Sequence, residues 1–126
     1  MKQILITVGG IEYKGILKDT LTAEAINKSL PIEGLAQIWG NEIYFSAPVN
    51  VDEESDSKEE VEVGDLAFWP IGSAFCIFFG KTPMSTGDKP RAASPVNVFG
   101  KIEGTTEKLK QVEPGSMIQI RKLNQE

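Results

Sequence analysis

The chain has 126 residues, of which 40% are hydrophobic and 25% charged, a composition typical of one soluble folded domain over residues 1–126. No apolar run approaches the roughly 20 residues of a membrane-spanning helix. The net charge is −5, and residues 52–60 account for it with six acidic side chains and one lysine, which leaves 12 acidic and 12 basic residues elsewhere. Because no basic surplus remains, we expect no nucleic acid as a partner, and because no apolar run is long enough, we expect no membrane.

The first half of the chain predicts two hairpins and a helix. Strands are expected over residues 3–8, 11–17, 34–39 and 42–49. Gly9-Gly10 separates the first pair and Gly40-Asn41 the second, and both dipeptides favour two-residue turns. A helix is expected over about residues 23–29, with Thr22 as its N-cap and Leu30-Pro31 after its end. Because residues 1–8 have the pattern of a strand, we expect no signal peptide there.

The second half adds further strands around two polar segments. These strands are expected over residues 61–69, 74–79, 96–102 and 117–123, and a second short helix over 105–112. The acidic segment 52–60 has no aromatic residue, so we expect a solvated surface loop that contributes little to stability. Residues 81–95, with three prolines, predict a long loop. Together the elements predict a mostly β fold, a small closed antiparallel β-barrel of about eight strands with two short helices.

Several kinds of chemistry are excluded by composition. The chain has no histidine, which removes serine–histidine and cysteine–histidine catalytic centres and histidine-ligated zinc. Its glycines form no phosphate-binding loop, and the acidic segment lacks the ligand spacing of a calcium loop. We therefore expect no metal and no cofactor. The single Cys76 lies in an apolar run, which predicts a buried, unreactive thiol and agrees with a cytoplasmic location.

Three stretches of the second half carry a family resemblance. In order and spacing, residues 64–70 (GDLAFWP), 72–80 (GSAFCIFFG) and 96–104 (VNVFGKIEG) resemble the second half of cyclophilins, peptidyl-prolyl isomerases built on a closed antiparallel β-barrel. With residues 93–98 (ASPVNV), they are similar to a group of small prokaryotic cyclophilin-like proteins without an established activity. The resemblance implies the barrel fold of that group in shortened form.

The same resemblance implies that the isomerase groove has changed. On the aligned strings, Cys76 takes the place of a phenylalanine of the proline pocket, and Val96 takes the place of its histidine. The segment corresponding to that of the catalytic arginine, residues 35–45, contains no arginine. If the lost arginine resembles a lost oxyanion-hole donor, its absence costs about 3 kcal/mol of barrier lowering. The resemblance therefore implies a retained fold with weak or absent isomerase activity.

The groove can still bind a ligand. Its candidate lining residues are Tyr44, Phe68, Trp69, Met84 and Arg91, with Phe75 as a further candidate. Phe68 and Phe75 have an alternative place in the barrel core, and Arg91 has one in a surface loop. We expect a module that binds a peptide segment or a small molecule. The alternative is a weak peptidyl-prolyl isomerase in which Arg91 or a backbone donor replaces the missing arginine. A metal or small-molecule enzyme is least favoured, because the chain has no histidine. The sequence leaves the oligomeric state open.

Overall fold

Ten strands and two helical segments make up the computed structural model, which describes residues 2–123. The strands are β1 (Gln3–Val8), β2 (Ile11–Leu17), β3 (Ile32–Leu35), β4 (Gln37–Ile38), β5 (Glu42–Ser46), β6 (Lys58–Glu60), β7 (Asp65–Trp69), β8 (Ala74–Phe78), β9 (Arg91–Ile102) and β10 (Met117–Leu123). The α-helix α1 spans Leu21–Ser29, and the 3-10 helix η1 spans Glu107–Gln111. Every strand pair is antiparallel, so the predicted mostly β antiparallel class is confirmed.

The prediction of a closed barrel with two helices is wrong. The strand order runs β3-β10-β1-β2-β9-β7-β8-β5-β4, with β6 paired to β9 outside this path, so β3 and β4 are free ends of an open sheet. These two strands are consecutive in the chain. Between them, Ala36 bonds to the turn before β10, since its N–H donates to the Ser116 carbonyl and its carbonyl accepts from Gly115. One chain segment therefore borders both ends of the sheet, and no ladder joins those ends.

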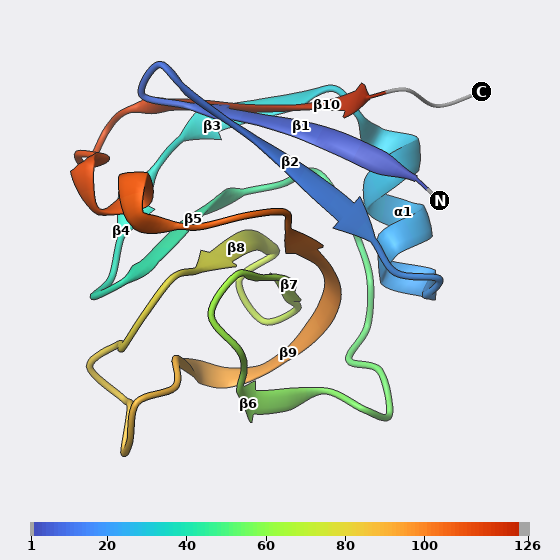
Figure 1. The fold of residues 1–126 in the computed structure, drawn as a ribbon. Coiled ribbons are helices and arrows are strands. Elements are labelled where there is room, and N and C mark those ends of the chain that lie inside the picture. Colours follow the sequence, from blue (N-terminus) through green and yellow to red (C-terminus); the bar gives the residue numbers. More distant parts are fainter. Residues whose placement is uncertain (1, 124–126) are drawn as a thin grey trace.

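The helical predictions also need correction. The α-helix starts at Leu21, and its N-cap is Thr20, whose hydroxyl accepts from the Ala23 N–H at 3.0 Å. The segment expected as a second helix forms only η1, which has no side-chain cap at its start and is short enough for 3-10 geometry. The helix α1 and the 3-10 helix η1 lie on opposite sides of the molecule (Figure 1). Within residues 2–123, no helix has the length and apolar character to cross a membrane.

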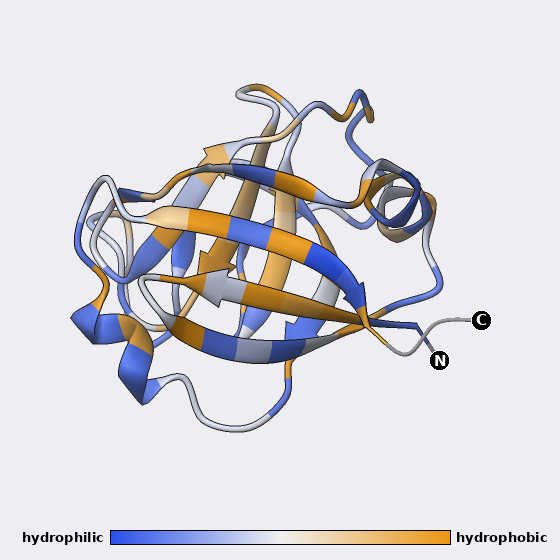
Figure 2. Cartoon of the chain, turned by 90° about the horizontal axis from the view of Figure 1, so that it is seen from above, coloured by the Kyte–Doolittle hydropathy of each residue, from blue (hydrophilic) through white to orange (hydrophobic). Residues whose placement is uncertain are grey.

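The inner face of the sheet is an apolar core. Buried residues alternate with partly buried or exposed ones along β1 and β2, as expected for strands with one face inward, and Figure 2 shows apolar and polar bands alternating along the strands. The ring of Phe75 packs between Phe45 and Phe99, with ring centroids 5.4 and 5.1 Å away. Phe99 sits at a bulge where β7 pairs with Gly100 and then with Val98, and this bulge bends the long strand β9 (Figure 1).

The acidic segment is anchored to the body of the protein, contrary to the expectation of a solvated loop. The carboxylate of Glu54 accepts hydrogen bonds from the backbone N–H and the hydroxyl of Thr22, in the first turn of α1. The buried side chain of Asn97 on β9 accepts from the Glu54 N–H at 2.9 Å and donates to the Asp52 carbonyl at 2.9 Å. Residues 58–60 then form β6 against β9. Hydrogen bonds hold this segment in place, and the composition of the segment does not reveal them.

Candidate functional site

A second apolar layer covers the outer face of the sheet. All five residues of β8 are buried, because Phe75 and Ile77 face the inner core while Ala74, Cys76 and Phe78 join a separate cluster. The apolar run around Cys76 predicted this burial. The cover consists of Val61, beside β6, and of Ala92 and Val96, in the first half of β9. The bend in β9 folds that half over the sheet (Figure 1).

A cavity of about 200 Å³ opens in this second layer, and we call it the aromatic pocket. Its lining residues come from the turn before β5, from β5 itself, from the end of β7 and from the first half of β9. They are Trp39, Glu42, Tyr44, Trp69, Ala92, Ala93 and Val96. The chain has two tryptophans, and both line this pocket.

Strand periodicity and one tight turn bring these side chains together. Glu42 and Tyr44 lie two residues apart on β5 and therefore share a face, the same face as their cross-strand partners Phe78 and Cys76. Trp39 precedes the predicted two-residue turn, which forms as expected, with backbone hydrogen bonds in both directions between Trp39 and Glu42 at 2.9 and 3.1 Å. Gly40 takes a φ of +60° in this turn. The hairpin thus pairs Trp39 with Glu42, and both residues line the pocket.

The ring of Trp69 is held from two sides. Its Nε1–H donates to the hydroxyl of Ser94 on β9, so its one polar atom already has a partner. Its six-membered ring lies against Gly72, where an added Cβ would come within 2.4 Å of the ring carbons Cε3 and Cζ3. Only glycine leaves room for the indole there. The wall that Trp69 forms is therefore preorganised.

Glu42 is the one charged residue among those that line the pocket. Its side chain is buried, with 6% of its surface exposed, and burial raises the pKa of this carboxyl to about 7, opposed only by a hydrogen bond from the Cys76 thiol. No lysine or arginine is among the lining residues. The pocket therefore holds a carboxyl that is partly ionised at neutral pH and has no counter-charge.

Cys76 lies behind the pocket and is closed off from solvent. It is 1% exposed, and its thiol has two acceptors in reach, the Ala74 carbonyl at 3.7 Å and the Glu42 carboxylate. Burial raises the pKa of the thiol well above its usual range, and the negative charge of Glu42 raises it further. The predicted burial of Cys76 is confirmed, and its sulfur stays protonated.

We expect Cys76 to resist modification in the folded protein. A thiol reagent such as 5,5′-dithiobis(2-nitrobenzoate) should react at least about a hundredfold more slowly with native than with denatured protein, since only the thiolate attacks. Absorbance after mixing measures both rates. Rapid labelling of the native chain would show that the thiol faces the aromatic pocket and is open to solvent.

The structure brings together two of the residues predicted from sequence. Tyr44 and Trp69 both line the aromatic pocket. Phe68 is fully buried in the inner core, and Phe75 packs there as well, as their alternative interpretation proposed. Met84 is exposed in the loop before β9 and is not among the lining residues. Arg91 is also absent from the lining, because its guanidinium pairs with Glu59 on β6 at 2.5 Å.

Sequence reasoning missed Trp39 and Glu42. The alternation of residues 42–46 offered a signal, since Glu42 and Tyr44 fall on one face of the strand while Ile43 and Phe45 fall on the other. Nothing in the sequence showed that β9 would cover that face and bury the carboxyl. Val96, aligned with the histidine of the cyclophilin proline pocket, also lines this cavity.

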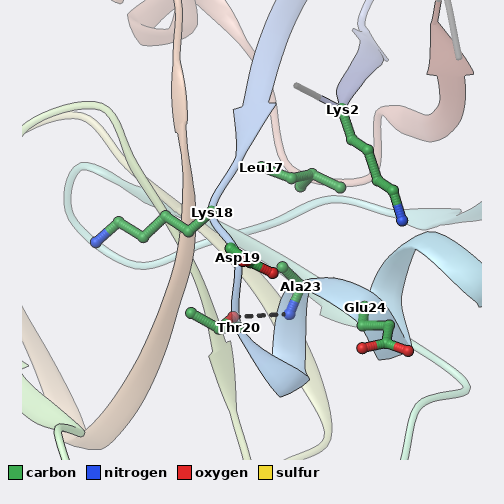
Figure 3. A pocket seen from close by; sticks show the side chains of 7 residues that line it. All are labelled: Lys2, Leu17, Lys18, Asp19, Thr20, Ala23 and Glu24. Atoms are coloured by element: carbon green, nitrogen blue, oxygen red, sulfur yellow. Dashed lines mark hydrogen bonds between the residues drawn. The ribbon is translucent and has the colours of Figure 1, made fainter.

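A second hollow, of about 320 Å³, lies at the start of α1 between the end of β2 and Lys2. Figure 3 shows its side chains, with the Thr20 hydroxyl bonded to the Ala23 N–H and Lys18 directed away from the others. The polar group nearest the helix start is thus already used as a cap. The hollow combines exposed lysines and acids without a buried polar group in need of a partner, which favours the aromatic pocket as the site.

Comparison with known proteins identifies a family and a similar solved structure. The family model described as cyclophilin-like matches residues 2–121. The solution structure of a hypothetical protein from Archaeoglobus fulgidus is 42% identical, with a TM-score of 0.82, over 97% of this chain and 95% of that chain. No curated protein matches. These comparisons agree on the fold and name no reaction or ligand.

Proposed function

The chain belongs to the cyclophilin-like family, as the motifs of residues 64–104 predicted, and from that premise we propose that it is a binding module without effective isomerase activity. Its ligand is a small molecule or a single side chain of a peptide, held in the aromatic pocket. The observation that carries this proposal is the convergence of both tryptophans and Tyr44 on one cavity beside a buried carboxyl. Apolar walls with few polar groups are typical of ligand sites.

The size of the pocket supports a small occupant. Its volume of about 200 Å³ lies below the roughly 300 Å³ at which sites for drug-sized ligands begin. A compact ligand or one side chain fits that volume better than an extended prolyl peptide does. The fixed position of the Trp69 ring favours binding further, since a preorganised wall loses little conformational freedom when a ligand enters.

We expect at most trace prolyl isomerisation. The positions of the cyclophilin pocket hold Cys76 and Val96, residues 35–45 contain no arginine, and Arg91 is engaged by Glu59. A protease-coupled assay on a prolyl tetrapeptide measures the rate. Turnover like that of an ordinary cyclophilin, abolished in Arg91→Ala, would contradict the binding-module proposal and support the alternative of a prolyl isomerase that uses Arg91.

We expect Gly72→Ala to weaken ligand binding without unfolding the protein. The added methyl group displaces the Trp69 ring, because it would lie 2.4 Å from the ring carbons, and the backbone of Gly72 needs no positive φ. Fragments that quench tryptophan fluorescence in the wild type should lose about tenfold or more in affinity. Gly87→Ala is the matched control, because a Cβ there meets nothing within 4 Å. Equal loss in both variants, or none in either, would count against the pocket.

A further inference from the structure

The composition of the aromatic pocket indicates the charge of its ligand. Three of its seven lining residues, Trp39, Tyr44 and Trp69, carry aromatic rings, and the one charged group among the seven is the carboxyl of Glu42. Aromatic faces carry negative electrostatic potential and attract cations, most strongly when the site is desolvated. A carboxylate beside the rings also attracts a cation. No lysine or arginine is among the lining residues, so no positive charge in the wall attracts an anion.

Glu42 also lacks a partner suited to its charge. The Cys76 thiol is a weak donor, and the carboxyl is almost fully buried. A buried carboxylate without a cation is costly, so an arriving cation recovers free energy that the folded protein lacks. The two cationic side chains that come just before Ala92 in the chain are already engaged, since Arg91 pairs with Glu59 at 2.5 Å and Lys89 pairs with Glu62 at 2.8 Å.

We propose that the aromatic pocket binds a methylated ammonium group, with Trp39, Tyr44 and Trp69 around the cation and Glu42 as its counter-charge. This inference rests on the proposed function and specifies its ligand class. Methyl groups suit the apolar walls, because they spread the positive charge over a weakly hydrated surface that leaves water readily. An unmethylated ammonium keeps a tight hydration shell that this cavity cannot replace, since Glu42 is its only acidic group.

The surroundings of Glu42 set the expected pH dependence. On its own strand it faces Tyr44, and from β8 it faces Cys76, whose raised pKa keeps it neutral. The lining residues from β7, β9 and the preceding turn do not titrate. Because the Glu42 pKa is about 7, its ionised fraction rises about tenfold between pH 6 and pH 8. Cation affinity should rise with it, whereas a neutral ligand accepting a hydrogen bond from protonated Glu42 would bind better at low pH.

The test compares choline with 3,3-dimethylbutan-1-ol, which has the same shape with carbon in place of the charged nitrogen. Both are titrated into the full chain, and tryptophan fluorescence reports on the pocket because it holds both tryptophans. We expect choline to bind at least about tenfold more tightly than the alcohol at pH 8, and to lose most of that advantage at pH 6. Tetramethylammonium should give the same pattern.

Two variants separate the site from the general acidity of the chain. Glu42→Gln should remove the preference for choline over the alcohol and its pH dependence, while Glu33→Gln, which removes an exposed carboxyl on β3, should change neither. Should Glu42→Gln fail to fold, the wild-type comparison of the two isosteres still decides. A peptide that carries trimethyllysine is compared with the same peptide carrying unmodified lysine, to distinguish a protein-borne cation from a free one. The proposal is supported if the methylated peptide binds more tightly than the unmodified one, or if choline binds more tightly than the alcohol.

The outcomes also separate this proposal from the proposed function. Equal or tighter binding of the alcohol overturns the cation assignment but leaves a ligand-binding pocket. Choline binding that Glu33→Gln weakens as much as Glu42→Gln overturns it as well, since the attraction would then be nonspecific. If neither isostere binds and the fragments used with Gly72→Ala also leave the fluorescence unchanged, both proposals fail.

Discussion

Replacing Asn97 with alanine is expected to lower the free energy of unfolding by about 3 kcal/mol, equivalent to roughly 10 °C in melting temperature. The amide of this residue joins three elements, because it accepts from the Glu54 N–H and donates to the Asp52 carbonyl and to the Thr22 hydroxyl of α1. Its removal leaves backbone groups of the acidic segment without partners at a site where Asn97 is 1% exposed. Denaturant unfolding followed by circular dichroism measures the loss.

Asn50→Ala provides the matched control, since Asn50 is exposed two residues before the same segment. It should change stability by no more than about 0.5 kcal/mol. A similar, small effect of both substitutions would mean that the acidic segment behaves as the solvated loop expected from its composition, and that the hydrogen bonds of Asn97 add little.

Replacing Glu42 with glutamine is expected to raise stability above neutral pH by up to about 3 kcal/mol. The pKa of Glu42 is raised from 4.5 to about 7 in the folded chain, so folded protein keeps a proton that unfolded protein releases between these values. The wild type therefore loses stability as the pH rises from 4.5 to about 7 and loses no more above it. The Glu42→Gln variant does not lose stability in this way, because glutamine has a similar shape and carries no ionisable group.

The difference between variant and wild type isolates Glu42 from the other acidic groups. Plotted against pH, it should be near zero at about pH 4 and level off above pH 7. The same difference for Glu33→Gln should be flat, since that side chain is exposed. A flat line for Glu42→Gln would contradict the burial of an unpartnered carboxyl in the aromatic pocket. A stabilising substitution at this position is expected if the carboxyl serves binding rather than folding.

The sequence predicted most of the strands because local patterns determine them. Residues 3–8, 11–17 and 117–123 form strands with the expected bounds, and the turns at Gly9-Gly10 and Gly40-Asn41 lie where their dipeptides placed them. Two failures have long-range causes. Sheet closure depends on whether β3 and β4 pair with each other, and neither strand carries that information. The ordered acidic segment depends on Asn97, which lies 43 residues from Glu54 in the chain.

The sequence predicted only part of the candidate site, because long-range contacts decide which residues line it. Tyr44 and Trp69 followed from their apolar surroundings and from the family resemblance, and both line the pocket. Glu42 and Trp39 were missed, because a glutamate on a strand normally faces water and only the bend of β9 buries this one. Arg91 was assigned to a long loop, yet it begins β9, where Glu59 on the neighbouring β6 neutralises it.

The most direct test of the central claim, that the aromatic pocket is the ligand site, is a fragment screen followed by two-dimensional ¹H–¹⁵N NMR. The chain has two indole N–H groups, those of Trp39 and Trp69, so the pocket has its own signals in the spectrum. We expect bound fragments to shift both indole signals and the amides of Glu42, Tyr44 and Val96. Shifts gathered instead around Thr20 and Lys2, in the hollow beside α1, with both indole signals unmoved, would contradict the claim.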